Sequence, residues 1–293
     1  MMYVFNGISI TFALLMVTLS AVYADEKSKE FYDFDGDGIN DSIIQSRVNN
    51  VLHLSIYMSS ISKNLTYEIT PPDDNNFPVV HSSYKFDEIE VDSTHYSRQG
   101  QVYSEVYKWV PDKKQWLLVS VITGERSDPI SGIFTPSLEI ERVSCCRKIG
   151  ENQHSISYKS KSDVKNEINN ELKKISDLLK ENKSEHAIKS INIYSAAEYV
   201  TTINDSNVVL LNDLAFFLAK KDNIASAIIL KDIVDQYPSR VVAKLNLADV
   251  YWELGKDYNH YDKARTLYKE YKNEMIEKGL NKNIPKRVFL REN

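Results

Sequence analysis

Hydrophobic and polar residues alternate along much of the first half of the chain. Residues 51–57, 84–91 and 102–110 show this alternation and are rich in β-branched and aromatic side chains. A period of two residues is typical of a strand with one buried face. The stretch at 102–110 and the apolar stretch at 115–122 are separated by a Pro-Asp-Lys-Lys turn, which predicts a hairpin. We therefore expect an antiparallel β-domain.

The hydrophobic period becomes that of a helix in the second half of the chain. Large apolar side chains recur three or four positions apart at 168–179 and again at 188–200, which places them on one face of a helix. The pattern therefore predicts an α+β chain. The expected segments are a β-domain at 25–150, a polar linker at 151–162, helices at 163–280 and a tail at 281–293.

One short pattern occurs twice among the predicted helices. In each copy a Leu-Ala pair is followed by an alanine and then by a large residue, and Pro238 closes the first copy. Small residues at such positions let two helices approach closely. The positions are Leu214, Ala215, Ala227 and Leu230 in the first copy, and Leu247, Ala248, Ala264 and Tyr268 in the second.

This pattern resembles the tetratricopeptide repeat, a unit of about 34 residues built from two helices. The resemblance covers residues 207–278 well and 163–205 weakly, and an irregular helical bundle is the alternative. It implies a stack of helix pairs with a concave protein-binding face lined by the first helix of each pair. We expect Asn212, Asn246 and Asp249 to face solvent there. The full set of expected partner-binding residues is Asn212, Phe216, Lys220, Asn246, Asp249 and Glu253.

The segment at 33–41 concentrates carboxylates at alternate positions around a glycine. An EF-hand-type loop takes calcium ligands from positions one, three, five, seven and nine, and turns at a glycine at position six. Position twelve is Ile44 in place of the usual glutamate, and a solvated turn is the alternative. We expect a calcium ion with a structural role, followed by a strand. Its ligands would be Asp33, Asp35, Asp37, the carbonyl of Ile39, and Asp41, with Gly38 at the turn.

The first domain also resembles exported bacterial β-domains of the lysozyme-inhibitor or immunity type. These begin with an Asp-Gly-Asp-Gly loop that leads into a strand, and later carry an aromatic hairpin. Here the hairpin reads Tyr107-Lys108-Trp109 and Trp116-Leu117-Leu118. The resemblance covers residues 31–125. It implies a role in protecting a cell from toxins that attack its envelope.

The N-terminus predicts export. Residues 8–17 are mostly apolar, and small or apolar side chains precede a cleavage position after Ala24, which is typical of a signal peptide at 1–24. The apolar stretch is shorter than the roughly 20 residues that span a bilayer. An uncleaved anchor is the alternative. We expect a periplasmic or secreted protein with no transmembrane segment after cleavage.

Charge and cysteine content narrow the function classes. The whole chain carries a formal net charge of −5, and residues 25–150 hold 20 acidic and 13 basic side chains. An acidic domain argues against nucleic-acid binding, which needs clustered Lys and Arg. Cys145 and Cys146 are adjacent. A strained vicinal disulfide, two thiols and a bridge to another chain all remain open.

Catalytic motifs are missing from the sequence. The six histidines are scattered without metal-ligand spacing, and no Gly-x-Ser-x-Gly, His-Glu-x-x-His or Walker pattern occurs. The acidic stretch at 87–92 is expected to be the solvated face of a strand. The sequence therefore favours a non-enzymatic periplasmic protein-binding module, in its sharpest form an immunity or inhibitor protein against a secreted toxin. An envelope assembly factor and a cell-wall hydrolase are the alternatives.

Overall fold

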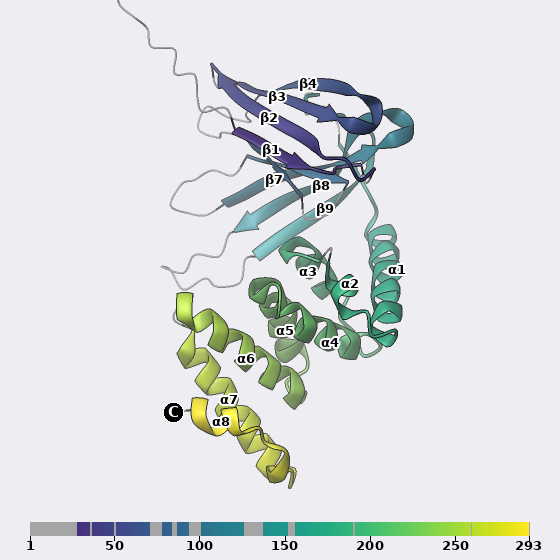
Figure 1. Cartoon of the computed structure of the whole chain (residues 1–293). Coiled ribbons are helices and arrows are strands. Elements are labelled where there is room, and N and C mark those ends of the chain that lie inside the picture. Colours follow the sequence, from purple (N-terminus) through teal and green to yellow (C-terminus); the bar gives the residue numbers. More distant parts are fainter. Residues whose placement is uncertain are drawn as a thin grey trace, which may run out of the picture.

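The computed structural model of the chain describes residues 28–35, 37–49, 51–70, 78–83, 87–93, 101–125, 137–151, 156–189, 191–258 and 260–292. The signal peptide expected at 1–24 lies outside the described residues. Two antiparallel sheets lie at one end of the molecule and the helices lie at the other (Figure 1). The expected α+β fold, with an N-terminal antiparallel β-domain and C-terminal helices, is confirmed.

The first sheet is an antiparallel meander of four strands in the order β1-β2-β3-β4. β2 begins at Asp41, directly after the acidic loop, so the strand expected there is present. Each strand pairs with the next along the chain. The strands are β1 (Ser28–Tyr32), β2 (Asp41–Val48), β3 (Val51–Met58) and β4 (Lys63–Ile69), with the 3₁₀-helix η1 (Ser59–Ile61) between the last two.

The second sheet contains six strands in the order β10-β9-β8-β7-β6-β5 and is antiparallel throughout. The hairpin expected around the Pro-Asp-Lys-Lys turn is present as β7 and β8. The strands are β5 (Val79–Ser82), β6 (Glu88–Asp92), β7 (Gln101–Val110), β8 (Gln115–Glu125), β9 (Ser137–Cys145) and β10 (Ser157–Tyr158), with η2 (Pro111–Lys113) in the β7–β8 turn.

A hydrophobic core lies between the two sheets. Trp109 and Trp116 face each other across the β7–β8 hairpin, with ring centroids 5.5 Å apart. Phe34, from the acidic loop, packs edge-on against Trp116 with ring centroids 5.8 Å apart. All three rings are buried. Burial of large aromatic rings dominates the energy of a core of this size, so the acidic loop is attached to the centre of the sandwich.

Positive φ angles occur where the chain reverses. Ser62 and Lys114 end η1 and η2 in the left-handed conformation, and their amides donate back to Ser59 and Pro111. Gly124, in β8, has φ of +139°, and a Cβ atom there would lie 2.0 Å from the carbonyl oxygen of Ser137. Only glycine fits where β8 and β9 approach this closely.

The second half of the chain forms eight helices in the described residues. Side-chain caps begin several of them: Ser160 caps the first, Asn192 the third and Asp222 the fifth. The segment expected as a tail holds the last helix. The helices are α1 (Lys161–Lys180), α2 (Ser184–Ile188), α3 (Ile193–Val200), α4 (Val208–Leu218), α5 (Asn223–Gln236), α6 (Val241–Tyr258), α7 (Tyr261–Glu277) and α8 (Lys286–Arg291), with η3 (Asn281–Asn283) before α8.

Neighbouring helices pack into one continuous core. α4 packs on α5, α5 on α6, α6 on α7, and α7 on α8. The eight positions of the twice-repeated sequence pattern are all buried in this core. The hydroxyl of Ser226 on α5 donates to the carbonyl of Ala215 on α4 at 2.8 Å. This contact requires small side chains on both helices.

The helices contact the second sheet through α3 and α1 (Figure 1). Tyr194 on α3 donates a hydrogen bond of 2.7 Å to Glu90 on β6. Arg142 on β9 extends between the layers and binds carboxylates on α1 and α3. Both faces of the second sheet are therefore buried, one against the first sheet and the other against the helices.

Candidate functional site

The acidic loop brings three carboxylates together. Ligand oxygens of Asp33, Asp35 and Asp37 all lie within 4.8 Å of one another. A cluster of this kind suits a hard divalent cation, since calcium prefers carboxylate oxygens. The geometry permits a cation at this loop, with Asp33, Asp35 and Asp37 as its side-chain ligands.

Backbone amides hold the loop in shape. The amide of Gly38 donates to Asp33 at 3.0 Å, and the amide of Ile39 donates to Asp37 at 2.7 Å. Gly38 has φ of +85°, which a residue with a side chain rarely adopts. The glycine expected at the turn of the loop is therefore required by the backbone conformation.

Two serines of η1 complete the loop and were not expected from the sequence. The hydroxyl of Ser59 donates to Asp37 at 2.8 Å, and that of Ser60 donates to Asp35 at 2.5 Å. Both serines come directly after β3, more than 20 positions beyond the aspartates to which they donate. No local pattern connects them to the loop, because the first sheet brings them there through the pairing of β2 with β3.

Asp41 and Ile39 occupy different places from the three clustered carboxylates. The carboxylate of Asp41 is fully buried and accepts hydrogen bonds from the amides of Phe34 at 2.8 Å and Ser59 at 2.7 Å. Burial outweighs these hydrogen bonds and raises the pKa of Asp41. Asp41 thus connects the loop to η1 and lies outside the group of three. The carbonyl of Ile39 lies 3.5 Å from the hydroxyl of Ser59.

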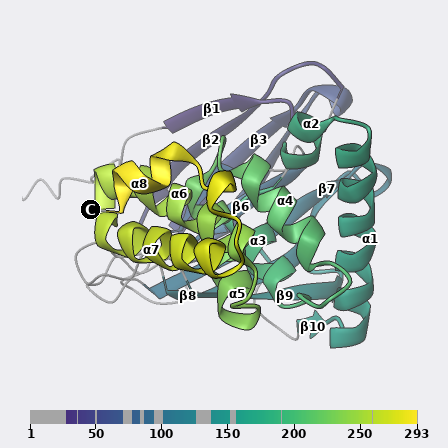
Figure 2. The ribbon, with the colours of Figure 1, turned by 90° about the horizontal axis from the view of Figure 1, so that it is seen from below.

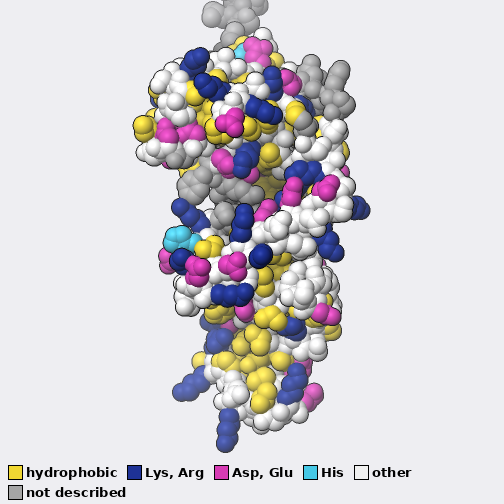
Figure 3. Space-filling model, turned by 90° about the vertical axis from the view of Figure 1, so that its right-hand side faces the viewer, with side chains coloured by type: hydrophobic (Ala, Val, Ile, Leu, Met, Phe, Trp, Pro, Cys, Tyr) yellow, Lys and Arg dark blue, Asp and Glu magenta, His cyan; other side chains and the backbone are white. Residues whose placement is uncertain are grey.

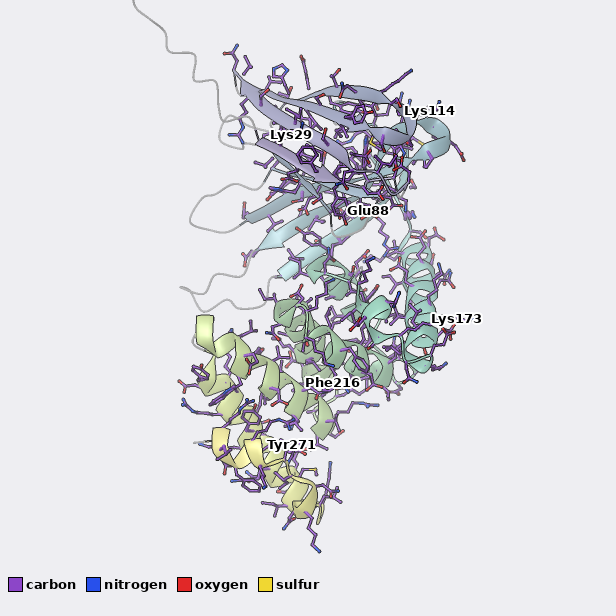
Figure 4. The ribbon with its side chains drawn as sticks, in the orientation of Figure 1. Lys29, Glu88, Lys114, Lys173, Phe216 and Tyr271 are labelled. Atoms are coloured by element: carbon purple, nitrogen blue, oxygen red, sulfur yellow. The ribbon has the colours of Figure 1, made fainter. Side chains whose placement is uncertain are left out.

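The acidic stretch at 87–92 is not a solvated face. Glu88 and Glu90 are 8% and 7% exposed, because the helices cover this face of the second sheet. Figure 4 places Glu88 where the sheets meet the helices. Glu90 accepts the hydrogen bond from Tyr194, and Asp87 pairs with Lys108 at 2.5 Å. The expectation of a solvated face was wrong because alternation reveals two faces but not what packs on each.

The expected partner-binding residues of the helices separate into buried and exposed groups. Asn212 on α4 and Asn246 on α6 are 7% and 8% exposed, and the amide of Asn246 donates to Asn212 at 3.2 Å. The expectation that they face solvent is wrong. Each amide is a partner for the other, so they join α4 to α6. Phe216 and Lys220, in contrast, are exposed on α4.

Asp249 and Glu253 on α6 are partly covered by the C-terminal helix. Arg287 on α8 donates to Asp249 at 2.7 Å, and Tyr268 on α7 also donates to it at 2.7 Å. Arg291 lies 3.8 Å from Glu253. Asp249 therefore attaches α8 to the helical stack, contrary to the expectation that it faces solvent. The hydrogen bonds that Arg287 donates to Asp249 are the principal cause of the raised pKa of that arginine.

A groove of about 520 Å³ lies between β9, α1 and α3. Ligand pockets commonly enclose roughly 300–1,000 Å³. Sequence reasoning missed this groove, since it forms where the two halves of the chain meet. Its walls come from β9 and β10, from the first turns of α1, and from the end of α3.

Cys146 is disulfide-bonded. Sequence reasoning left this residue as a thiol, a vicinal disulfide or a bridge to another chain. Neither free thiol chemistry nor metal binding is therefore assigned to Cys146.

No protein-family model matches the chain, and comparisons with curated proteins and with solved structures gave no significant match. Among the described residues, no helix has both the length and the apolar character that crossing a membrane requires.

Proposed function

We propose that the chain is a non-enzymatic, periplasmic protein-binding module. In this proposal the helices bind a partner protein, and the β-domain carries a structural calcium ion at the acidic loop. The sharpest version is an immunity or inhibitor protein that binds a secreted toxin directed at the cell envelope. The observation that carries the proposal is an exposed apolar stripe on α4.

Val209 and Phe216 form this stripe. They lie seven positions apart on α4, hence on one side of the helix, and are 53% and 49% exposed. Val242 on α6 is 59% exposed. The hydrogen bond between Asn246 and Asn212 sets α6 against the same side of α4. Exposed apolar groups of this kind, rimmed by polar residues, mark protein-interaction sites.

The same surface offers charge at its edge. Lys220 follows Phe216 by one turn and is exposed. Hydrophobic side chains gather on the helical half of the face shown in Figure 3, and Figure 4 labels Phe216 on α4. An aromatic anchor surrounded by polar groups is the usual composition of a binding hot spot. The resemblance of the helices to tetratricopeptide repeats supports the same proposal.

Calcium at the acidic loop would strengthen the connection between two segments of the first sheet, the loop itself and η1. Asp33, Asp35 and Asp37 provide the carboxylates, and η1 is already attached to them by the hydroxyls of Ser59 and Ser60. Three carboxylates held this close repel one another, and a divalent cation would remove that repulsion. The ion would thereby stabilise the loop that carries Phe34 into the core.

Partner binding is tested with a matched pair of substitutions. Phe216→Asp places a charge in the proposed face, whereas Phe289→Asp places the same charge at an apolar residue of similar exposure, 47%, on α8. Each variant and the wild type are used for affinity purification from periplasmic extract, after circular dichroism has shown equal helix content. We expect Phe216→Asp alone to lose the partner. Equal recovery by all three proteins refutes the role of α4.

Calcium binding is tested by calorimetry and thermal unfolding. Calcium should raise the melting temperature of the wild type, because a ligand that binds only the folded state stabilises it. Asp35→Asn should abolish this rise. Asp112→Asn, at the exposed acidic position of η2, should leave it unchanged. A wild type with neither binding heat nor a shift in melting temperature removes calcium from the proposal.

Two outcomes would replace the proposed function. Release of dye from labelled peptidoglycan by the purified protein favours a cell-wall hydrolase. Capture of several envelope subunits in place of one toxin favours an assembly factor. A toxin gene beside the gene for this chain favours the immunity role, because toxin and immunity protein are normally encoded together.

A further inference from the structure

β9 has one edge paired and the other edge mostly open. β8 pairs with β9 from Ser137 to Arg142 on one edge. On the other edge, β10 pairs only with Val143 and Cys145, at the C-terminal end of β9. β10 stops there because the chain turns into α1, which Ser160 caps. Figure 2 shows β10 and the start of α1 beside β9. The open edge therefore covers the first five or six residues of β9.

The direction of the backbone groups at this edge follows from one hydrogen bond. The amide of Lys159 donates to the carbonyl of Arg142 at 2.8 Å, so the backbone groups of Arg142 point away from β8. Backbone groups alternate in direction along an antiparallel strand. Those of Leu138 and Ile140 therefore point outward as well. In the described part of the chain these outward groups have no hydrogen-bond partner.

The groove between β9, α1 and α3 runs along this open edge. Its lining includes every residue of β9 from Leu138 to Arg142. A pocket on a face of a sheet would be lined by alternate residues, because neighbouring side chains point to opposite faces. Consecutive residues therefore show that the groove follows the edge. Five residues of a strand extend over roughly 13 Å.

The α1 wall of the groove is apolar with a positive rim. Val164 and Ile168 line it together with Lys161 and Lys165, all on one side of the helix. Within the described residues, neither Lys161 nor Lys165 has a carboxylate partner. Lys159, beside them, is paired with Glu167 at 2.6 Å. Glu139 and Glu141 also line the groove, but by alternation they lie on the face of β9 opposite to Arg142, which binds the helices. The two ammonium groups therefore favour acidic side chains only at those positions of an occupant that face α1.

We propose that this groove binds an extended segment of a partner protein, which adds to the second sheet as a strand beside β9. Main-chain hydrogen bonds to Leu138 and Ile140 would supply affinity. Apolar and acidic side chains at the alternate positions facing α1 would meet Val164, Lys161 and Lys165. The inference rests on the proposed protein-binding function but uses a surface separate from Phe216.

The probe is a capped octapeptide with the sequence Thr-Val-Thr-Asp-Thr-Val-Thr-Asp. Its controls are a peptide with Lys in place of Asp and a scrambled peptide that lacks the alternation. Binding to the full mature chain is measured by calorimetry. Hydrogen exchange is measured in parallel at the amides of Leu138 and Ile140, which strand addition would protect.

Two protein variants test the mechanism. Ile140→Pro removes the outward amide while sparing the bonds to β8, because proline is tolerated at an edge whose N–H faces outward. Ile140→Val is its control and keeps the amide. Lys161→Glu with Lys165→Glu reverses the rim. We expect Ile140→Pro to weaken binding about tenfold, the loss of one main-chain hydrogen bond with its alignment, and Ile140→Val to have little effect.

The outcomes decide between strand addition and other modes. The proposal is supported if the Asp peptide protects the amides of Leu138 and Ile140 from exchange, if the Lys peptide binds more weakly, and if the charge-reversed protein binds the Asp peptide more weakly. Absence of saturable binding by all peptides overturns it, as does binding without protection of those amides in the wild type. If the wild type captures a partner that Phe216→Asp loses, but no peptide binds, this inference fails while the proposed function stands.

Discussion

Arg142 connects the second sheet to the helices through four hydrogen bonds, and its removal should destabilise the chain. The guanidinium binds both oxygens of Glu198 on α3, at 2.6 and 2.9 Å. It also donates to Glu167 at 3.0 Å and to Glu171 at 3.1 Å on α1. Burial opposes its charge, but these contacts outweigh burial and raise the pKa of Arg142 above its ordinary value.

Exposure determines how much each pair contributes. The side chains of Arg142 and Glu198 are 12% and 11% exposed, whereas Glu167 and Glu171 are 40% and 33% exposed. Exposed pairs contribute about 0–1 kcal/mol, so the bidentate pair with Glu198 dominates. Breaking a buried pair costs about 3–5 kcal/mol, because the remaining charge stays buried. For Arg142→Met we expect a loss of about 3 kcal/mol, at the lower end of that range.

Two further variants separate charge from packing. Arg142→Lys keeps the charge but loses the planar fork, and should cost about 1–2 kcal/mol. Adding Glu198→Gln to Arg142→Met removes the stranded carboxylate. The double variant should therefore be more stable than the sum of the two single changes predicts, by about 1–3 kcal/mol.

The assay is urea unfolding followed by two probes. Fluorescence is measured in a Trp252→Phe background, because Trp252 lies on α6 and would add a helical signal. The remaining Trp109 and Trp116 then report on the β-domain, while far-ultraviolet circular dichroism follows mainly the helices. We expect the two transitions to coincide in the wild type and to separate in Arg142→Met, since the coupling between the layers is weakened. A loss below about 0.5 kcal/mol, the size of an ordinary surface change, would refute this reasoning. Additive single and double changes would refute it as well.

Three further predictions follow from buried groups. Burial, and to a lesser extent Lys263, lower the pKa of His260 to about 4. Because the pKa in the unfolded chain is about 6.5, the free energy of unfolding should fall as the pH drops from 6.5 to 4, by at most about 3 kcal/mol. His260→Gln should remove this part of the pH dependence measured by urea unfolding. Trp116→Ala should cost about 3–5 kcal/mol in urea unfolding, because it empties a fully buried site; a loss under about 1 kcal/mol contradicts the described packing. Asn246→Ala leaves Asn212 without its donor and should cost about 1–3 kcal/mol, whereas a stability equal to wild type would show that the pair is not buried.

The β-domain could be predicted from the sequence because its information is local. Alternation defines the strands, and the turn around Pro111 joins β7 to β8 directly. In a meander of hairpins the order along the chain is also the order in the sheet, so strand order needs no long-range information. The acidic loop was predictable for the same reason, since Asp33, Asp35, Asp37 and Gly38 are close in sequence.

What could not be predicted depends on contacts between distant segments. Ser59 and Ser60 reach the acidic loop through the pairing of β2 with β3. Glu88 and Glu90 are buried because α3 packs beneath the second sheet, and no pattern within β6 indicates this. The groove beside β9 needs both halves of the chain. Each of these features arises from tertiary packing, which periodicity within one element does not encode.

The helical face shows why polarity alone is a poor guide to a binding surface. Asn212 and Asn246 were expected to face solvent because they are polar and lie outside the repeated Leu-Ala pairs at 214–215 and 247–248. A buried amide is tolerated when another group satisfies it, and these two satisfy each other across α4 and α6. Phe216 is the reverse case, a large apolar side chain that is half exposed. Single exposed apolar side chains are common, and Phe289 is exposed to a similar extent. What distinguishes Phe216 is its grouping with Val209 on α4 and Val242 on α6, because grouped apolar side chains are better indicators of a binding surface than isolated ones.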